Sequence, residues 1–294
     1  MKPAAFDYRA PDTLEDALSI LAEEGDTARI LAGGQSLMPA LNLRLTAPAV
    51  LVDINGIAAL ERVAHNAEGG LLLGALTRHR RIETDPAIAR AVPLLATAAP
   101  HIAHLPIRTR GTLGGSLAHA DPAAEWPAIC LACDAVMHLA APGATRTVPA
   151  ETFFRGVFAT SLQPGEMLTA IAFPPWPARR CHGFREVARR RGDFAMAGAA
   201  VTLDLDAEGR CGAARIVLFA VADRPLRRRA AEAALVGRHP APALLREAAA
   251  LAAERLDPQG DLHASAEYRR RVAPVMVRRA LEDALGDTEG RVAA

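Results

Sequence analysis

Hydrophobic residues recur at helical spacing between Thr13 and Gly25, which makes this segment the clearest local signal in the chain. The apolar positions on one helix face are Leu14, Ala17, Leu18 and Leu21. Thr13 can cap the first turn, with Asp16 three residues later, and Gly25 can end the helix. The pattern therefore predicts an amphipathic helix near the N-terminus.

Short apolar runs and helical stretches alternate after this helix. We expect a strand at residues 29–31, a helical stretch and a second strand at residues 50–53. Further strands are expected at residues 71–73, 136–139 and 168–173. A helix is expected within residues 87–99, and another starts at Asp121 and Pro122, which suit the N-cap and first helical positions.

Consecutive prolines in PPWP, residues 174–177, mark the best boundary in the chain, because they continue neither a ladder nor a helix. Beyond them, residues 184–221 alternate like an antiparallel sheet. Three helical patterns then run to Leu285, the last of them capped by Ser265. The fold class expected is α+β, with a two-lobed domain at residues 1–176 (lobes about 1–58 and 59–176) and a C-terminal antiparallel sheet with helices at residues 177–294.

Composition narrows the function classes. The 294 residues carry 34 Lys and Arg against 33 Asp and Glu, a balance that gives no electrostatic footprint for nucleic acid. No apolar run approaches a membrane span, and the N-terminus lacks a signal-peptide core, so we expect a cytoplasmic chain. Four cysteines do not make a disulfide framework in a chain of this size.

Two glycine motifs carry most of the chemical information. LAGGQSLMP spans residues 31–39 and RGTLGGSLAHADPAAEWP spans residues 110–127. A glycine pair lets backbone N–H groups approach an anion, and a following helix adds partial positive charge. Neither motif is the Rossmann or the Walker sequence. Two such loops suit a dinucleotide with two phosphates, although each alone could be an ordinary turn.

With the opening FDYRAPDTLEDAL and the segments at residues 153–174, 184–198 and 261–270, these motifs resemble the FAD-binding (medium) subunit of the molybdenum hydroxylases, of the carbon monoxide, xanthine and aldehyde dehydrogenase type. The similarity covers nearly the whole chain. It implies a PCMH-type FAD-binding domain at residues 1–176 and a CO dehydrogenase flavoprotein-like C-terminal domain at residues 177–294.

The resemblance also implies a set of FAD-binding residues, with no catalytic and no metal-ligating residue in this chain. The set is Ala32, Gly33, Gly34, Gln35, Ser36, Leu37, Thr112, Leu113, Gly114, Gly115, Ser116, Asp121, Glu125, Ile171 and Arg185. Because related flavoproteins attach FAD through a histidine at the position of Gln35, an amide there implies non-covalent FAD. Asp121 could instead be a plain helix cap, and Arg185 a surface arginine.

Other reactive residues have weaker interpretations. Asp193 and Phe194 resemble residues that border the flavin face, although Phe194 could simply be core. Cys130 and Cys133 form C-x-x-C inside a predicted helix, so we expect buried, inert thiols rather than a metal site. His119 lacks the converging partners of a hydrolase triad.

Asn42 and Thr109 stand where many relatives have lysine and asparagine, respectively. The runs of consecutive arginines indicate, first of all, solvent-exposed faces.

The function implied is electron transfer within a complex. A large molybdenum-cofactor subunit would oxidise the substrate, a small subunit would pass electrons through [2Fe–2S] clusters, and FAD here would give them to NAD, a quinone or oxygen. A dimer of heterotrimers is the assembly expected. The alternatives are a self-contained FAD-dependent oxidoreductase of the same FAD-binding fold and an assembly module that has lost FAD.

Overall fold

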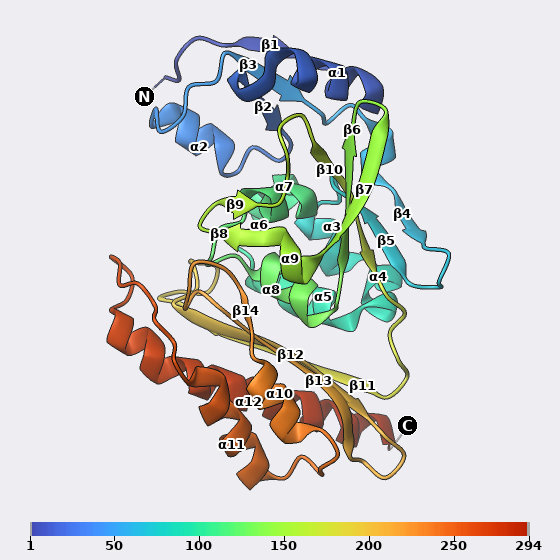
Figure 1. Cartoon of the computed structure of the whole chain (residues 1–294), viewed down its shortest axis with the longest axis vertical. Coiled ribbons are helices and arrows are strands. Elements are labelled where there is room, and N and C mark those ends of the chain that lie inside the picture. The colour runs from blue at the N-terminus through green and yellow to red at the C-terminus, as the bar shows by residue number, and fades with distance from the viewer. Residues whose placement is uncertain (1, 293–294) are drawn as a thin grey trace.

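The N-terminal lobe is a small parallel sheet with two helices, the first of which packs against the sheet. The computed structural model describes residues 2–292, with side chains for residues 2–286. Figure 1 shows this lobe at the top, with strand order β1–β3–β2. Its elements are β1 (Asp7–Arg9), α1 (Leu14–Glu24), β2 (Ala28–Leu31), α2 (Leu37–Asn42) and β3 (Val50–Asp53). The predicted cap of α1 is confirmed, since the N–H of Asp16 donates to Thr13 Oγ1 at 3.1 Å.

The middle of the molecule is a five-stranded antiparallel sheet, ordered β4–β5–β10–β6–β7, with helices beside it (Figure 1). Its strands are β4 (Val63–His65), β5 (Leu71–Gly74), β6 (Val136–Ala141), β7 (Ala144–Pro149) and β10 (Met167–Phe173). Its helices are α3 (His79–Thr84), α4 (Pro86–Ala91), α5 (Pro93–Ala98), α6 (Leu105–Arg110), α7 (Leu113–His119), α8 (Glu125–Ala132) and α9 (Ala150–Phe153). A hairpin of β8 (Phe154–Gly156) and β9 (Ala159–Thr160) adjoins them.

One helix prediction in this part is confirmed and one is wrong. The helix expected within residues 87–99 is found as α4 and α5, which are interrupted at Pro93 because proline cannot donate a hydrogen bond back into α4. The helix expected from Asp121 begins only at Glu125, with Ala124 as its N-cap. The Asp121 side chain instead accepts from the N–H of Ala123 at 2.8 Å and closes a turn between α7 and α8.

The C-terminal part is a four-stranded antiparallel sheet buried between two sets of helices. The strands are β11 (Arg180–Val187), β12 (Ala197–Leu205), β13 (Cys211–Phe219) and β14 (Leu226–Arg227). The following helices are α10 (Arg229–Leu235), α11 (Pro242–Ala253) and α12 (Ala266–Val292). Helix α12 packs on β11 and β12, and α8 packs on β12 and β13 (Figure 1). The expected antiparallel sheet and the Ser265 cap of α12 are confirmed.

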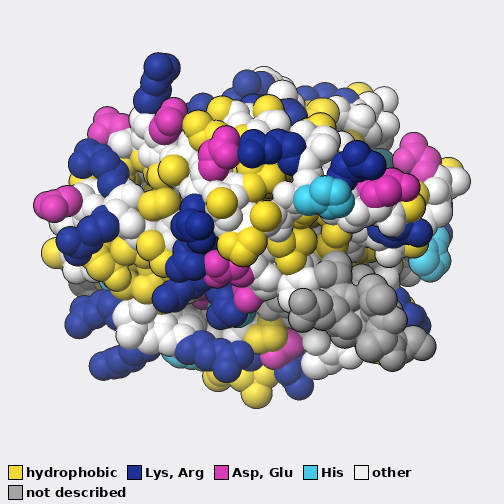
Figure 2. Space-filling model, turned by 90° about the horizontal axis from the view of Figure 1, so that it is seen from below, with side chains coloured by type: hydrophobic (Ala, Val, Ile, Leu, Met, Phe, Trp, Pro, Cys, Tyr) yellow, Lys and Arg dark blue, Asp and Glu magenta, His cyan; other side chains and the backbone are white. Residues whose placement is uncertain are grey.

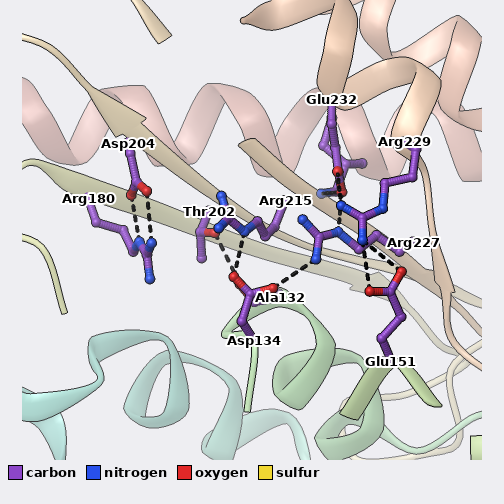
Figure 3. Close-up of polar contacts among 11 residues, drawn as sticks. Ala132, Asp134, Glu151, Arg180, Thr202, Asp204, Arg215, Arg227, Arg229 and Glu232 are labelled. Atoms are coloured by element: carbon purple, nitrogen blue, oxygen red, sulfur yellow. Dashed lines mark hydrogen bonds and ion pairs between the residues drawn. The ribbon is translucent and has the colours of Figure 1, made fainter. Parts of the chain in front are cut away.

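Ion pairs join the C-terminal sheet to the middle of the molecule (Figure 3). Asp134, which follows α8, accepts from Arg215 Nε at 2.7 Å and from Arg227 Nη1 at 2.8 Å. Glu151 of α9 accepts from Arg229 at 2.8 Å. The hydroxyl of Thr202 also donates to the carbonyl of Ala132, at 3.1 Å. These contacts fix the sheet against α8 and α9.

The end of the molecule occupied by the C-terminal part is rich in arginine without being uniformly basic. Figure 2 shows basic side chains interspersed with acidic and apolar ones over this face. All four cysteines are buried, as expected for inert thiols, and burial raises the pKa of Cys133 to about 12. Within the described residues, no helix is long and apolar enough to cross a membrane.

Candidate functional site

An open pocket of about 480 Å³ lies between the first glycine motif and α6. Four of the expected FAD-binding residues line it, namely Ala32, Gly33, Gly34 and Gln35. Asn42, the position where relatives carry lysine, lines it as well. Ile107 and Arg110 of α6 complete the opposite wall.

The first glycine motif presents free backbone donors. Among the described residues, the N–H groups from Gly33 to Leu37 have no hydrogen-bond acceptor within the chain. The loop turns through Gly34, whose φ of +72° favours glycine. The side-chain amide of Gln35, through Nε2, donates to the carbonyl of Gly33 at 2.9 Å. Successive free N–H groups before a helix form a suitable site for an anion.

The second glycine motif is helix rather than loop. Thr112 caps α7, and its side-chain oxygen accepts from the N–H of Gly115 at 3.1 Å. The N–H of Gly114 donates to the carbonyl of Ala75 at 2.8 Å, and that of Ser116 to the carbonyl of Thr112 at 3.1 Å. The N–H groups of Leu113 to Ser116 are therefore already used. Its contribution to a ligand site would be shape rather than free N–H groups.

The two motifs meet because their glycines allow close backbone approach. A Cβ on Gly33 would lie 2.6 Å from the carbonyl oxygen of Arg110 and 2.8 Å from the Cα of Gly111. A Cβ on Gly115 would lie 3.7 Å from the Cβ of Ala32. The first motif thus lies directly against the start of the second. Two segments about eighty residues apart in the sequence are therefore neighbours in the fold.

A polar network beneath the first motif was not identified from the sequence. Asn55 Nδ2 donates to the carbonyl of Ala32 at 2.8 Å, and Asn55 Oδ1 accepts from Arg78 Nη2 at 2.7 Å. Arg78 also donates to the carbonyl of Arg110. Asn55 and Arg78 thereby hold both motifs together. The available signal was the position of Asn55 just after β3, because the carboxyl ends of neighbouring parallel strands lie together.

Asp53 gives this pocket a fixed negative charge. Burial acts to raise its pKa, but hydrogen bonds from Tyr8 and Asn55 outweigh burial, so the pKa lies below its usual value. The hydroxyl of Tyr8 donates to Asp53 Oδ2 at 2.5 Å. Arg110, which faces the same pocket, adds a positive charge. A ligand in this pocket would therefore meet the guanidinium of Arg110 and free backbone N–H groups. The carboxylate of Asp53 is already hydrogen-bonded to Tyr8 and Asn55.

The remaining expected FAD-binding residues do not line this pocket. Ile171 is fully buried in β10 between β5 and β6, and Leu113 is buried in α7. Arg185 pairs with Asp283 of α12 at the surface. Glu125 is buried at the start of α8, where burial and the charge of Glu186 raise its pKa to about 8. Ser36, Leu37, Thr112 and Ser116 flank the glycines without lining the pocket.

A smaller pocket of about 320 Å³ lies on the other side of α6. His104, Leu105 and Arg108 line it from the helix side, and Arg191 from the loop that precedes β12. Phe194 of the same loop is 59% exposed, so the interpretation of Phe194 as core is wrong. Helix α6 therefore lies between the two pockets and contributes residues to both.

The residues of the larger pocket fit FAD. Free N–H groups and the guanidinium of Arg110 match the charge of a diphosphate. Because Gly33 has no side chain, its backbone can lie directly against Arg110 and Gly111. Polar groups of the described chain thus favour a bound dinucleotide.

Two family models match this chain in sequence. Residues 4–176 match the FAD binding domain in molybdopterin dehydrogenase, and residues 182–284 match the CO dehydrogenase flavoprotein C-terminal domain. The 6-hydroxypseudooxynicotine dehydrogenase complex subunit alpha of Paenarthrobacter nicotinovorans is 41% identical over 97% of this chain and 96% of its own length. The caffeine dehydrogenase subunit beta of Pseudomonas sp. (strain CBB1) is 40% identical over 96% of this chain and 95% of its own length.

Solved structures agree with the sequence comparisons. A chain of carbon monoxide dehydrogenase from Hydrogenophaga pseudoflava superimposes with a TM-score of 0.94 at 37% identity, covering 97% of this chain and 99% of that one. A chain of quinoline 2-oxidoreductase from Pseudomonas putida 86 gives a TM-score of 0.92 at 41% identity, with the same coverage. The similarity therefore extends over the whole fold rather than over the glycine motifs alone.

Proposed function

Because this chain belongs to the FAD-binding subunits of the molybdenum hydroxylase family, we propose that it is the electron-exit subunit of an oxidoreductase complex. It takes electrons from a small [2Fe–2S] subunit and passes them to NAD, a quinone or oxygen. A large subunit carries the molybdenum cofactor and the substrate site. The assembly is a dimer of heterotrimers. When bound, FAD supplies a two-electron store that can be filled one electron at a time.

The range of substrates among the relatives supports this proposal. Chains of closely similar length and fold are named for the oxidation of caffeine, nicotine, carbon monoxide and glyceraldehyde. Substrates so unlike one another need different binding pockets, whereas delivery of electrons to an acceptor is a step that all can share. A chain that keeps one architecture across them is suited to that common step.

The proposed FAD site uses the pocket between the glycine motifs. The free N–H groups of residues 33–37 and the guanidinium of Arg110 would hold the diphosphate. The second motif would form the adjacent wall, and Asp121, Glu125, Ile171 and Arg185 are proposed for the flavin end. The same proposal divides the chain into an FAD-binding domain at residues 1–176 and a C-terminal domain at residues 177–294.

Non-covalent binding gives a direct chemical prediction. Acid precipitation of the purified yellow chain should release the flavin into the supernatant, because the amide of Gln35 cannot form the histidyl bond. Absorbance and mass of the supernatant flavin measure the release. Yellow colour that stays with the precipitated protein would contradict it.

The electron-exit role predicts which step needs FAD. In the assembled complex, removal of FAD should leave reduction of the iron–sulfur clusters by substrate intact and stop delivery to the final acceptor. Cluster reduction is followed by its visible absorbance, and delivery by reduction of the acceptor. If FAD removal instead stops the first reduction of the clusters, the flavin lies on the substrate side. Substrate oxidation by this chain alone would favour a self-contained flavoenzyme.

A further inference from the structure

A histidine and a tryptophan form a buried, hydrogen-bonded pair in the middle of the molecule. His79, the first residue of α3, is 5% exposed, and Trp126 of α8 is fully buried. The indole Nε1 of Trp126 donates to Nδ1 of His79 at 3.0 Å. Neither residue belongs to the set expected to bind FAD, and neither lines the larger pocket. Their contacts nevertheless lead to that pocket.

The hydrogen bond from Trp126 decides which ring nitrogen of His79 carries the proton. An indole N–H can only donate, so Nδ1 presents its lone pair and the neutral ring carries its hydrogen on Nε2. Burial keeps the ring neutral, and the charges of Arg78 and Arg108 act in the same direction, so the pKa of His79 is about 3. The imidazole is therefore held in a single tautomer.

The edge of the imidazole away from Trp126 lies against Gly111. A Cβ on Gly111 would lie 2.7 Å from both Cδ2 and Nε2 of His79. The backbone N–H of His79 also donates to the carbonyl of Gly111, at 3.0 Å. The φ of Gly111 is −58°, which any residue adopts. Space beside the imidazole, rather than backbone conformation, therefore calls for glycine at this position.

Gly111 connects this pair to the proposed FAD site. A Cβ on Gly33 would lie 2.8 Å from the Cα of Gly111 and 2.6 Å from the carbonyl oxygen of Arg110. Gly33 and Arg110 both line the larger pocket. A shift of Gly111 would therefore change the gap between the loop at Gly33 and the helix end that carries Arg110.

We propose that His79 and Trp126 are positioning residues for FAD binding, an inference that rests on the proposed function. Trp126 fixes the His79 ring, and the ring fixes Gly111. Gly111 in turn sets the distance between the free N–H groups at Gly33 and the guanidinium of Arg110. The diphosphate needs both groups at once, so the affinity for FAD depends on two side chains that act through Gly111 and not on the cofactor itself.

The main test measures the Kd for FAD of the FAD-free full chain, by the quenching of flavin fluorescence. His79→Ala should raise Kd about tenfold, because Gly111 loses the ring on which it packs. Gly111→Ala should also raise Kd about tenfold, because its methyl meets the ring. The double variant should bind FAD no more weakly than His79→Ala, because the methyl then enters the space that the ring has left.

His182→Ala is the matched control. His182 of β11 is also 5% exposed, and its Nε2 is hydrogen-bonded to the hydroxyl of Thr97 at 2.9 Å. It lines neither pocket. This variant loses a buried imidazole and its hydrogen bond, as His79→Ala does, and should lower Tm while leaving the Kd for FAD unchanged. The control separates a loss of stability from a loss of position.

Trp126→Phe tests the same pair with a smaller change, and it serves if His79→Ala does not fold. The phenylalanine ring keeps an aromatic group in the core but removes the donor to His79, so Kd should rise about fivefold. Nitrogen-15 NMR of the wild type should show a neutral His79 with its proton on Nε2, identified by its absence from His79→Ala. In Trp126→Phe this ring should become a mixture of both tautomers.

Three outcomes would overturn the positioning role. These are an unchanged Kd in a folded His79→Ala or Trp126→Phe variant, a double variant in which the separate effects of His79→Ala and Gly111→Ala multiply, or a wild-type His79 with its proton on Nδ1. If one of them appears while the wild-type chain binds FAD, the electron-exit role stands and the positioning role is wrong. A wild-type chain that binds no FAD would contradict both.

Discussion

Gly33→Ala is expected to abolish most FAD binding while the chain stays folded. The added methyl would lie 2.6 Å from the carbonyl oxygen of Arg110 and 2.8 Å from the Cα of Gly111, both of which are backbone atoms. Overpacking of this kind costs about 1–3 kcal/mol, and the clash can be relieved only by separating the two motifs. We therefore expect FAD affinity to fall about 10- to 100-fold.

The bound flavin per chain after gel filtration measures this effect, and circular dichroism checks folding. Gly56→Ala is the matched control in the same lobe, because its new methyl would find no atom closer than 3.9 Å. Full flavin occupancy in Gly33→Ala would mean that the first motif is an ordinary turn. Left-handed backbone plays no part at Gly33, since Gly34 is the residue of this pair with positive φ.

Asp134→Asn is expected to give the largest loss of stability among single polar substitutions. The variant keeps a side chain that tolerates the φ of +50° at this position, but it removes the charge that Arg215 and Arg227 share. Those guanidinium side chains are only 20% and 10% exposed; Arg215 loses its counter-charge in a poorly solvated place, whereas Arg227 keeps its pair with Glu232. We expect a loss of about 2 kcal/mol.

Calorimetry of the purified chain measures this loss as a fall of about 5 °C in Tm. Glu247→Gln serves as the control, because its pair with Arg238 is about half exposed on both sides and should contribute little. Equal Tm values for Asp134→Asn and the wild type would show that the network of Figure 3 contributes nothing to holding the sheet on α8.

Local signals in the sequence predicted the elements that depend on neighbouring residues. The Thr13 and Ser265 caps, the strand at residues 50–53 and the antiparallel C-terminal sheet are confirmed because capping and alternation are short-range properties. The helix expected from Asp121 failed for a long-range reason. The N–H of Ala220, beyond β13, donates to the carbonyl of Pro122 at 2.9 Å and holds this turn out of helical geometry.

For the candidate site too, local features could be predicted from the sequence and long-range contacts could not. The first motif was recognised as an anion-binding loop, and its unbonded N–H groups agree with that interpretation. The second motif has the same composition but forms the first turn of α7, because Ala75 and Thr112 accept its N–H groups. The hydrogen bond between Asn55 and Arg78 joins the two lobes, so the sequence signals the position of Asn55 after β3 but not its partner.

The unbonded N–H groups of residues 33–37 link the stability of this chain to the supply of its cofactor. A ligand that binds only the folded state stabilises it by RT ln(1 + [L]/Kd), so each tenfold rise in free FAD above Kd adds about 1.4 kcal/mol. FAD bound to these N–H groups would therefore add to the stability of the folded chain, and we expect the chain without flavin to be the less stable of the two.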